Sequence, residues 1–332
     1  MSLKKLVIFY RALGQMLQAG VPILRTLDTV SETMRSPALA GALAGIKQSI
    51  ERGSTLGEAM TDARVFPPMH TRLICVAERS GRVDLILIEL ASSTEQLVTM
   101  RQTLIAGSVF PLIVLHLGIF IPPTVTYAAQ SLLGQNPSLL IFLFSVTIPL
   151  VVVWGGVIVG VVLARTAVRS KEGAAFVDSI IGPLPLLGKT WREFDYWRVA
   201  TGVQMLTNAG MGIIEALRDC AEFCRSPRIA NALRDTADEV EREGGRVSDS
   251  FRATGVFPAE MISMWATGEE SGKLDDMLGR IATYYAERCN ARMQELARWL
   301  PRIAYALVSI YIIIQIFAMF SGYIKTITEL SQ

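Results

Sequence analysis

The segment from Gln102 to Ala164 reads QTLIAGSVFPLIVLHLGIFIPPTVTYAAQSLLGQNPSLLIFLFSVTIPLVVVWGGVIVGVVLA and contains no Asp, Glu, Lys or Arg. A helix needs about 20 apolar residues to cross the hydrocarbon core of a bilayer, so the segment is long enough for two spans. Its middle, residues 128–137, contains Gly134 and an Asn-Pro pair, which are typical of a turn. The sequence therefore predicts spans at 102–127 and 138–164, joined by a short loop.

A second uncharged run, residues 303–324, predicts a third span. The uncharged runs account for a composition that is 51% hydrophobic and only 19% charged. The remaining sequence has the composition of a soluble, Arg-rich helical protein. A net charge of +2 gives no indication of a nucleic-acid-binding surface. No apolar signal-peptide core follows the first residues, so we expect no cleaved leader.

The basic residues predict the orientation of the spans. Of the 32 Lys and Arg residues, all but Lys325 lie in segments 1–101 and 165–302. Because cytoplasmic segments next to spans are rich in Lys and Arg, both segments are expected in the cytoplasm of a bacterium, with the spans in its inner membrane. The predicted organisation is a cytoplasmic helical domain at 1–101, spans at 102–127 and 138–164 around a periplasmic loop at 128–137, a linker and second cytoplasmic domain at 165–302, a span at 303–324 and a periplasmic tail at 325–332.

The two predicted cytoplasmic segments share one sequence pattern, which indicates an internal repeat. Ala19-Gly20 matches Ala209-Gly210, and Phe66-Pro67 matches Phe257-Pro258. Further matches, in chain order, are Arg35, Ser36 and Pro37 with Arg225, Ser226 and Pro227, and Glu78, Ser80, Gly81, Arg82 and Asp84 with Glu269, Ser271, Gly272, Lys273 and Asp275. The matches extend over most of each segment, so we expect two related domains.

Helix signals recur within each repeat. Apolar residues between Leu6 and Leu17 recur at intervals of three and four. Helix starts are predicted at Pro22, at a Thr55–Glu58 capping box, and at the Phe-Pro pairs that contain Pro67 and Pro258; helix ends are predicted at Gly20, Gly210, Gly81 and Gly272. We therefore predict an all-α protein with about six short helices in each repeat. The last helix of each, starting near Val83 and Leu274, could continue into the following span.

These residues together resemble the F-type platform proteins of type II secretion, a family that includes inner-membrane core proteins of type IV pili. Gly268–Leu274 reads GEESGKL and is similar to the family's G-E-x-S-G-x-L, whereas the first copy has Ala77 in place of the glycine. Leu17–Pro22 resembles the family's L-x-x-G-V-P, and Pro185–Gly188 its P-x-x-G. Larger members carry an extra N-terminal segment, so the resemblance suggests a short pilus-type member.

The resemblance implies a scaffold in the inner membrane rather than an enzyme. Its expected partners are a cytoplasmic assembly ATPase, pilin or pseudopilin subunits, other inner-membrane components of the machine, and a second copy of itself. The resemblance implies no cofactor and no metal. It leaves open whether the fibre is a type IV pilus or a type II secretion pseudopilus.

The sequence contains a near-match to a nucleotide-binding motif but no complete catalytic motif. Gly182–Thr190 nearly fits a phosphate-binding P-loop, but five residues separate its glycines instead of four, and two prolines remove backbone donors. His70 and His116 are the only histidines, and the four cysteines have no zinc or disulfide spacing. A transporter or channel is the alternative function, and it would require ionisable groups or repeats within the spans.

The candidate contact residues cluster at the glycine turns. One interpretation is that Glu and Ser there only cap or flank a tight turn; the other is an exposed acidic corner that docks a partner or a second copy. The candidates are Glu78, Ser80, Gly81, Arg82, Glu269, Glu270, Ser271, Gly272 and Lys273, together with the turn residues Gly20, Pro22, Gly210, Pro67 and Pro258. The arginines Arg242, Arg246 and Arg252 are expected to form a solvated face.

Overall fold

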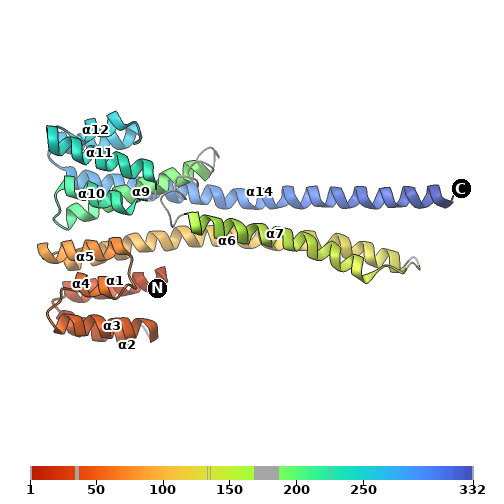
Figure 1. The fold of residues 1–332 in the computed structure, drawn as a ribbon, viewed down its shortest axis with the longest axis horizontal. Helices are drawn as coiled ribbons and strands as arrows, with labels where there is room; N and C mark the ends of the chain where they lie inside the picture. The colour runs from red at the N-terminus through yellow and green to blue at the C-terminus, as the bar shows by residue number, and fades with distance from the viewer. Residues whose placement is uncertain are drawn as a thin grey trace. The chain divides into compact units, whose positions relative to one another are not determined.

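The computed structural model describes residues 2–33, 37–132, 134, 136–167, 187–224 and 226–330. The chain divides into two compact units (Figure 1). The repeat unit comprises Met1–Arg101 and Ala174–Ala291, and the membrane unit comprises Gln102–Gly173 and Arg292–Gln332. All regular secondary structure in the described ranges is helical, which confirms the predicted all-α class.

Each repeat contains six helices in its described part. Repeat 1 is formed by α1 (Leu3–Gln18), α2 (Ile23–Thr33), α3 (Pro37–Glu51), α4 (Leu56–Asp62), α5 (Pro68–Ser80) and the first turns of α6 (Val83–Leu132). Repeat 2 is formed by α9 (Leu187–Asn208), α10 (Ile213–Phe223), α11 (Pro227–Glu243), α12 (Val247–Thr254), α13 (Ala259–Ser271) and the first turns of α14 (Leu274–Leu330). The helix count agrees with the prediction.

An aromatic cluster occupies the core of each repeat. In repeat 1 the ring of Phe66 lies 5.2 Å from that of Phe9, between centroids. In repeat 2 the ring of Phe257 lies 4.2 Å from that of Phe251, which in turn contacts Trp265 at 4.9 Å. All five side chains are buried. The matched Phe-Pro pairs therefore anchor the core through the phenylalanine, while the proline is the N-cap of α5 or α13.

The local helix signals are confirmed where the structure describes them. Thr55 and Glu58 form the predicted capping box at the start of α4. Gly81 and Gly272 are the C-caps of α5 and α13. Several sequence features lie wholly or partly outside the described residues: Arg35 and Ser36, Arg225, the linker from 168 to 186, and residues 182–186 of the near-match to a P-loop.

Helices α4 and α5 approach each other closely at Gly57. A Cβ atom placed on Gly57 would lie 2.4 Å from the Cys75 sulfur and 2.7 Å from the Cys75 backbone nitrogen. The equivalent pair in repeat 2 is Ser248 and Ala266. In repeat 2 the residue on the short helix is larger (Ser in place of Gly), and the residue that it faces is smaller (Ala in place of Cys). The packing of the short helix is therefore retained although the side chains differ.

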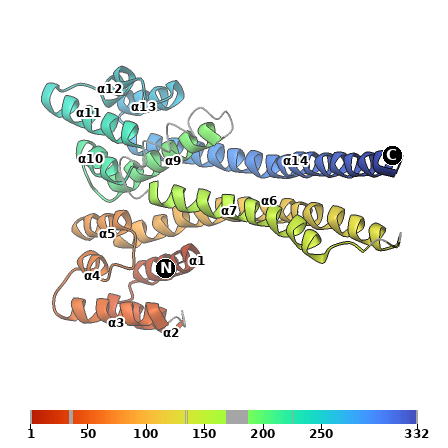
Figure 2. The same cartoon turned by 45° about the vertical axis from the view of Figure 1, so that its right-hand side comes forward.

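Three helices are long and apolar enough to cross a membrane: Val83–Leu132, Leu139–Val159 and Leu274–Phe317. The second lies within α7 (Leu139–Ala167), and Figures 1 and 2 both show α7 running alongside the C-terminal part of α6. Helices α6 and α14 each continue without a break from a repeat into a span, as the sequence suggested.

The prolines of the first span do not end it. Pro122 and Pro123 lie inside α6, which continues to Leu132, so the first half of the predicted loop at 128–137 is helical. Prolines are tolerated in spanning helices because neighbouring groups can take up the freed backbone hydrogen bonds.

Small residues and a few polar contacts join the spans within the membrane unit. Cβ atoms placed on Gly107 and Gly118 of α6 would lie 2.7 Å from the Ala297 side chain and 2.5 Å from the Val308 side chain of α14. The Trp154 indole donates to His116 Nε2 at 3.2 Å. Glycines at such crossings allow close packing between spanning helices, and His116 is helix-bonded and packed rather than isolated.

Candidate functional site

The carboxylate of Glu78 caps a helix that is distant in sequence. Its two oxygens accept hydrogen bonds from the backbone N–H groups of Leu56 and Gly57, at 2.6 and 2.8 Å. These amides belong to the first turn of α4, where backbone donors have no partner within the helix. Glu78, at the end of α5, therefore satisfies the start of α4 and holds the two helices together.

Glu269 makes the same arrangement in repeat 2. Its carboxylate accepts hydrogen bonds from the backbone N–H groups of Val247 and Ser248, at 2.8 and 3.2 Å, and from the Ser248 hydroxyl at 2.5 Å. The N-cap residue of α12 is Arg246, which makes no side-chain capping bond. An arginine cannot accept a hydrogen bond, and this was the sequence signal that α12 requires an acceptor from elsewhere.

The remaining carboxylate of the corner, Glu270, is exposed. It pairs with Arg246 at 2.8 Å, and both side chains are more than half exposed. Arg242 pairs with Glu243, and Arg252 with Asp249, also at the surface. Exposed ion pairs of this kind contribute little to stability. The arginines thus lie on a solvated face, as predicted, and Glu270 is the acidic group of this corner that solvent reaches most freely.

The corner of repeat 1 contacts repeat 2. The Ser80 hydroxyl donates to the carbonyl of Ala209 at 2.5 Å, and the Arg82 guanidinium donates to the carbonyl of Asn208 at 2.9 Å. A Cβ atom placed on Gly210 would lie 3.0 Å from the Ser80 Cβ. The Ser80-Gly81-Arg82 corner therefore binds the turn between α9 and α10, and the partner of this predicted contact surface is within the same chain.

Further contacts extend the interface between the repeats. The Asn208 amide donates to Glu89 at 2.7 Å, and Arg72 Nε donates to Asp219 at 2.6 Å. The Asp219 side chain is only 15% exposed. Because charge-assisted bonds with a partly buried carboxylate are stronger than surface pairs, this pair supports a fixed arrangement of the two repeats.

The other predicted contact residues lie at exposed turns. Ser271, Gly272 and Lys273 are all exposed, and the Ser271 hydroxyl donates to the carbonyl of Thr267 within its own helix. Gly20 is also exposed, in the turn between α1 and α2, with Pro22 just before α2. The structure therefore uses the corner of repeat 1 internally and leaves the corner of repeat 2 open to solvent.

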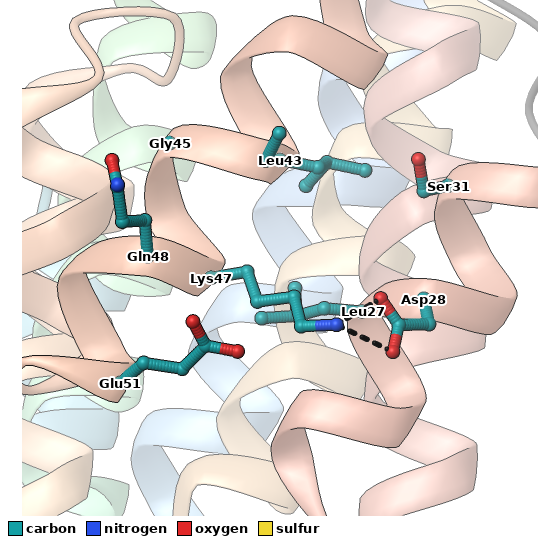
Figure 3. Close-up of a pocket in the computed structure, with 9 residues that line it drawn as sticks. Leu27, Asp28, Ser31, Leu43, Gly45, Lys47, Gln48 and Glu51 are labelled. Carbon is teal, nitrogen blue, oxygen red and sulfur yellow. Dashed lines mark hydrogen bonds and ion pairs between the residues drawn. The ribbon is translucent and has the colours of Figure 1, made fainter.

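A hollow of about 560 Å³ lies between α2 and α3 (Figure 3). Lys47 and Asp28 point toward each other across it and pair at 2.7 Å, next to the buried side chains of Leu27 and Leu43. Because the charges of Lys47 and Asp28 neutralise each other, the centre of the hollow has no unpaired charge that would attract an ion. Among the described residues, no group of three or more His, Cys, Asp or Glu is placed to hold a metal.

His70 is a half-buried group in repeat 1, packed against the buried ring of Tyr10. Its Nδ1 lies 3.0 Å from the Tyr10 hydroxyl, and the two rings pack edge to face. Burial, reinforced by the positive charge of Arg198, lowers the pKa of His70 to about 4. The histidine therefore serves packing and hydrogen bonding and stays uncharged at neutral pH.

The shifted pKa of His70 predicts an acid-sensitive stability. Between pH 6.5 and 4 the unfolded chain binds a proton that folded His70 does not, so stability falls as the pH falls, by about 2–3 kcal/mol at pH 4. His70→Gln keeps a polar partner for Tyr10 without titrating in this range. Thermal unfolding in detergent at pH 7, 5.5 and 4 should show a smaller loss for the variant, and parallel losses would contradict this assignment.

A family comparison matches each repeat together with the span that follows it. The sequence model described as "Type II secretion system (T2SS), protein F" matches residues 9–128 and again 203–322. The chain belongs to this family. The double match confirms the internal duplication that the glycine turns predicted.

Relatives from both kinds of machine are similar to the chain. Type II secretion system protein F of Pseudomonas aeruginosa is 29% identical over 297 residues, covering 85% of this chain and 73% of the relative. Type IV pilus assembly protein PilC of Myxococcus xanthus is 26% identical, covering 88% and 73%. PilC of Pseudomonas aeruginosa is 25% identical, covering 92% and 86%. With its three apolar helices, this family member is an inner-membrane protein of pilus or secretion machinery.

Proposed function

We propose that the chain couples a cytoplasmic assembly ATPase to the extraction of pilin or pseudopilin subunits from the inner membrane. The observation that carries this proposal is the continuity of α6 and α14, each of which runs from a repeat into a span. A displacement applied to a repeat can pass along such a helix into the span. Orientation by the positive-inside rule puts both repeats in the cytoplasm, where an ATPase acts.

The fixed contact between the repeats supports the same mechanism. Ser80 and Arg82 bind the turn of repeat 2, and Arg72 pairs with Asp219. Force applied to one repeat is therefore shared with the other, and both spans that follow the repeats respond together. Nucleotide turnover in the ATPase would shift this platform and lift one subunit at a time into the fibre.

The docking surface for the ATPase is proposed around Glu270, whose equivalent in repeat 1, Arg79, stays exposed beside the contact between the repeats. Reversing this charge, Glu270→Lys, should lower capture of the ATPase by the detergent-solubilised chain about tenfold, because complementary charge sets the orientation of encounter. Wild-type chain purified from the same membranes is the reference, and Arg242→Glu on the neighbouring solvated face is the control.

Two results would count against the proposal. Unchanged capture by the charge-reversed chain would remove the docking surface from this corner. Failure of the wild-type chain to retain either ATPase or pilin, in membranes that assemble fibres, would remove the coupling function and favour a transporter or channel component.

A further inference from the structure

Equivalent faces of the two repeats have different environments. The face of repeat 2 that points to repeat 1 carries Asp195 of α9 and Ala209 just after it, which are 5% and 0% exposed. At the equivalent positions of α1, Lys5 and Ala19 are exposed. The same helix face is thus covered in repeat 2 and uncovered in repeat 1.

Helix α5 of repeat 1 provides the cover. A Cβ atom placed on Gly202 would lie 2.7 Å from the methyl carbon of Met69, and one on Gly210 would meet Ser80. A Cβ atom placed on Gly20, the equivalent of Gly210, would meet no atom within 4 Å. The contact between repeats is therefore one-sided: the corner of repeat 1 binds repeat 2, and the reverse contact is not made by the described residues.

This one-sided contact leaves two complementary surfaces open in each chain. The receiving face is the outer side of α1 and the turn that follows it, where Lys5, Ile8, Ala19 and Gly20 are exposed and Ala12 is half-buried. The docking corner is Ser271-Gly272-Lys273 at the end of α13. Ile8 is an apolar side chain that is 54% exposed, which is consistent with a surface that another protein covers.

The docking corner has the same types of hydrogen-bond donor as the Ser80-Gly81-Arg82 corner, which binds repeat 2 within the chain. Ser271 corresponds to Ser80, with a hydroxyl that can donate to a backbone carbonyl, and Lys273 corresponds to Arg82, with a cationic donor. On the receiving face, the carbonyls of Gln18 and Ala19 correspond to those of Asn208 and Ala209. Both sides of the contact are thus available, but on separate copies of the chain.

The docking corner and the receiving face also carry opposite charges at equivalent places. Met69 of α5 and Asp195 of α9 line one small cavity at the existing contact. Their equivalents are Glu260 of α13 and Lys5 of α1, both exposed residues of opposite sign. Opposite charges at equivalent places favour the correct orientation of two copies.

We propose that the docking corner of one copy binds the receiving face of a second copy and so reproduces, between chains, the contact that joins the repeats within a chain. The contact is head-to-tail, so successive copies alternate repeat 1 and repeat 2. Such a contact generates a ring when its rotation closes and an open chain of copies when it does not. This inference concerns assembly alone and holds whichever fibre the machine builds.

The test uses two differently tagged full-length chains, Ala19→Cys and Ser271→Cys, co-expressed in membranes and treated with a short bis-maleimide. Both positions are exposed, so neither change disturbs the fold. We expect a product that carries both tags, at twice the 36.4 kDa of one chain. Each variant alone should give no more product than wild type, whose four native cysteines set the background. A mixed product no stronger than that background, or self-linking of either variant, would overturn the proposal.

A second variant tests the face itself. Ile8→Glu places a charge in the proposed contact, so the mixed product should fall about tenfold, whereas Ile8→Val should leave it unchanged. Thermal unfolding of the purified chain should be the same for both variants, because the side chain is exposed. Equal cross-linking of the Glu and Val variants would also overturn the proposal.

Discussion

Glu269→Ala should lower the stability of repeat 2 by about 3 kcal/mol, because it removes a carboxylate that accepts three hydrogen bonds from the start of α12. Val247 and Ser248 are buried, so their backbone donors would not regain water as partners without local opening. Glu78→Ala should have a similar effect on repeat 1 through α4. The measurement is thermal unfolding of the detergent-solubilised chain, together with the rate of proteolysis at α12.

Glu270→Ala is the matched control for Glu269→Ala. It removes the neighbouring carboxylate of the same motif, but that group is exposed and forms a surface pair with Arg246. The expected loss is below about 1 kcal/mol. If the two variants lose equal stability, Glu269 is not a capping residue, and its repetition in both halves of the chain would need a different explanation.

Gly210→Val should destabilise the chain by about 2 kcal/mol more than Gly20→Val. The two glycines occupy the same turn of the two repeats, with φ of +94° and +78°, so both substitutions bear the strain of a left-handed conformation. Only Gly210 faces Ser80, at 3.0 Å from a Cβ atom. The additional loss therefore measures the clash at the contact between repeats.

The comparison is best made in detergent at a chain concentration where copies are separated, because Gly20 belongs to the proposed receiving face. Unfolding is followed by tryptophan fluorescence, since Trp197 and Trp265 are buried in repeat 2. Equal losses for the two valine variants would show that the repeats do not bind each other through this turn in solution.

The local part of the fold could be predicted from the sequence because its signals are short-range. The capping box at Thr55 and the Phe-Pro starts of α5 and α13 involve residues within a few positions of each other. The spans were also predictable, since a long uncharged segment has few alternatives to a membrane helix. The end of the first span was not, because prolines that break helices in water are tolerated in a bilayer.

The role of the repeated glutamates could not be predicted from local pattern. Glu78 and Glu269 bind amides 21 or 22 positions earlier in the chain, a distance that only the packed repeat defines. The sequence did allow the capping interpretation, but for a nearby turn. Arg246 at an N-cap was the available hint of a distant acceptor.

The sequence also could not predict which of the two equivalent corners binds the other repeat. Ser80 and Ser271 occupy the same motif, as do Ala19 and Ala209, so the sequence pattern treats both corners alike. Which corner binds depends on the arrangement of the two repeats in space. Among the described residues, the first corner is the one that binds the other repeat, and this difference gave the proposed contact between copies.

The most direct test of the coupling function is made in a strain that lacks this chain. Cells complemented with wild type should assemble fibres, and the purified chain should retain both the assembly ATPase and the fibre subunit. The Glu270→Lys chain, at equal abundance in the membrane, should capture little ATPase and leave few fibres. Normal fibre numbers in the uncomplemented strain would contradict the account.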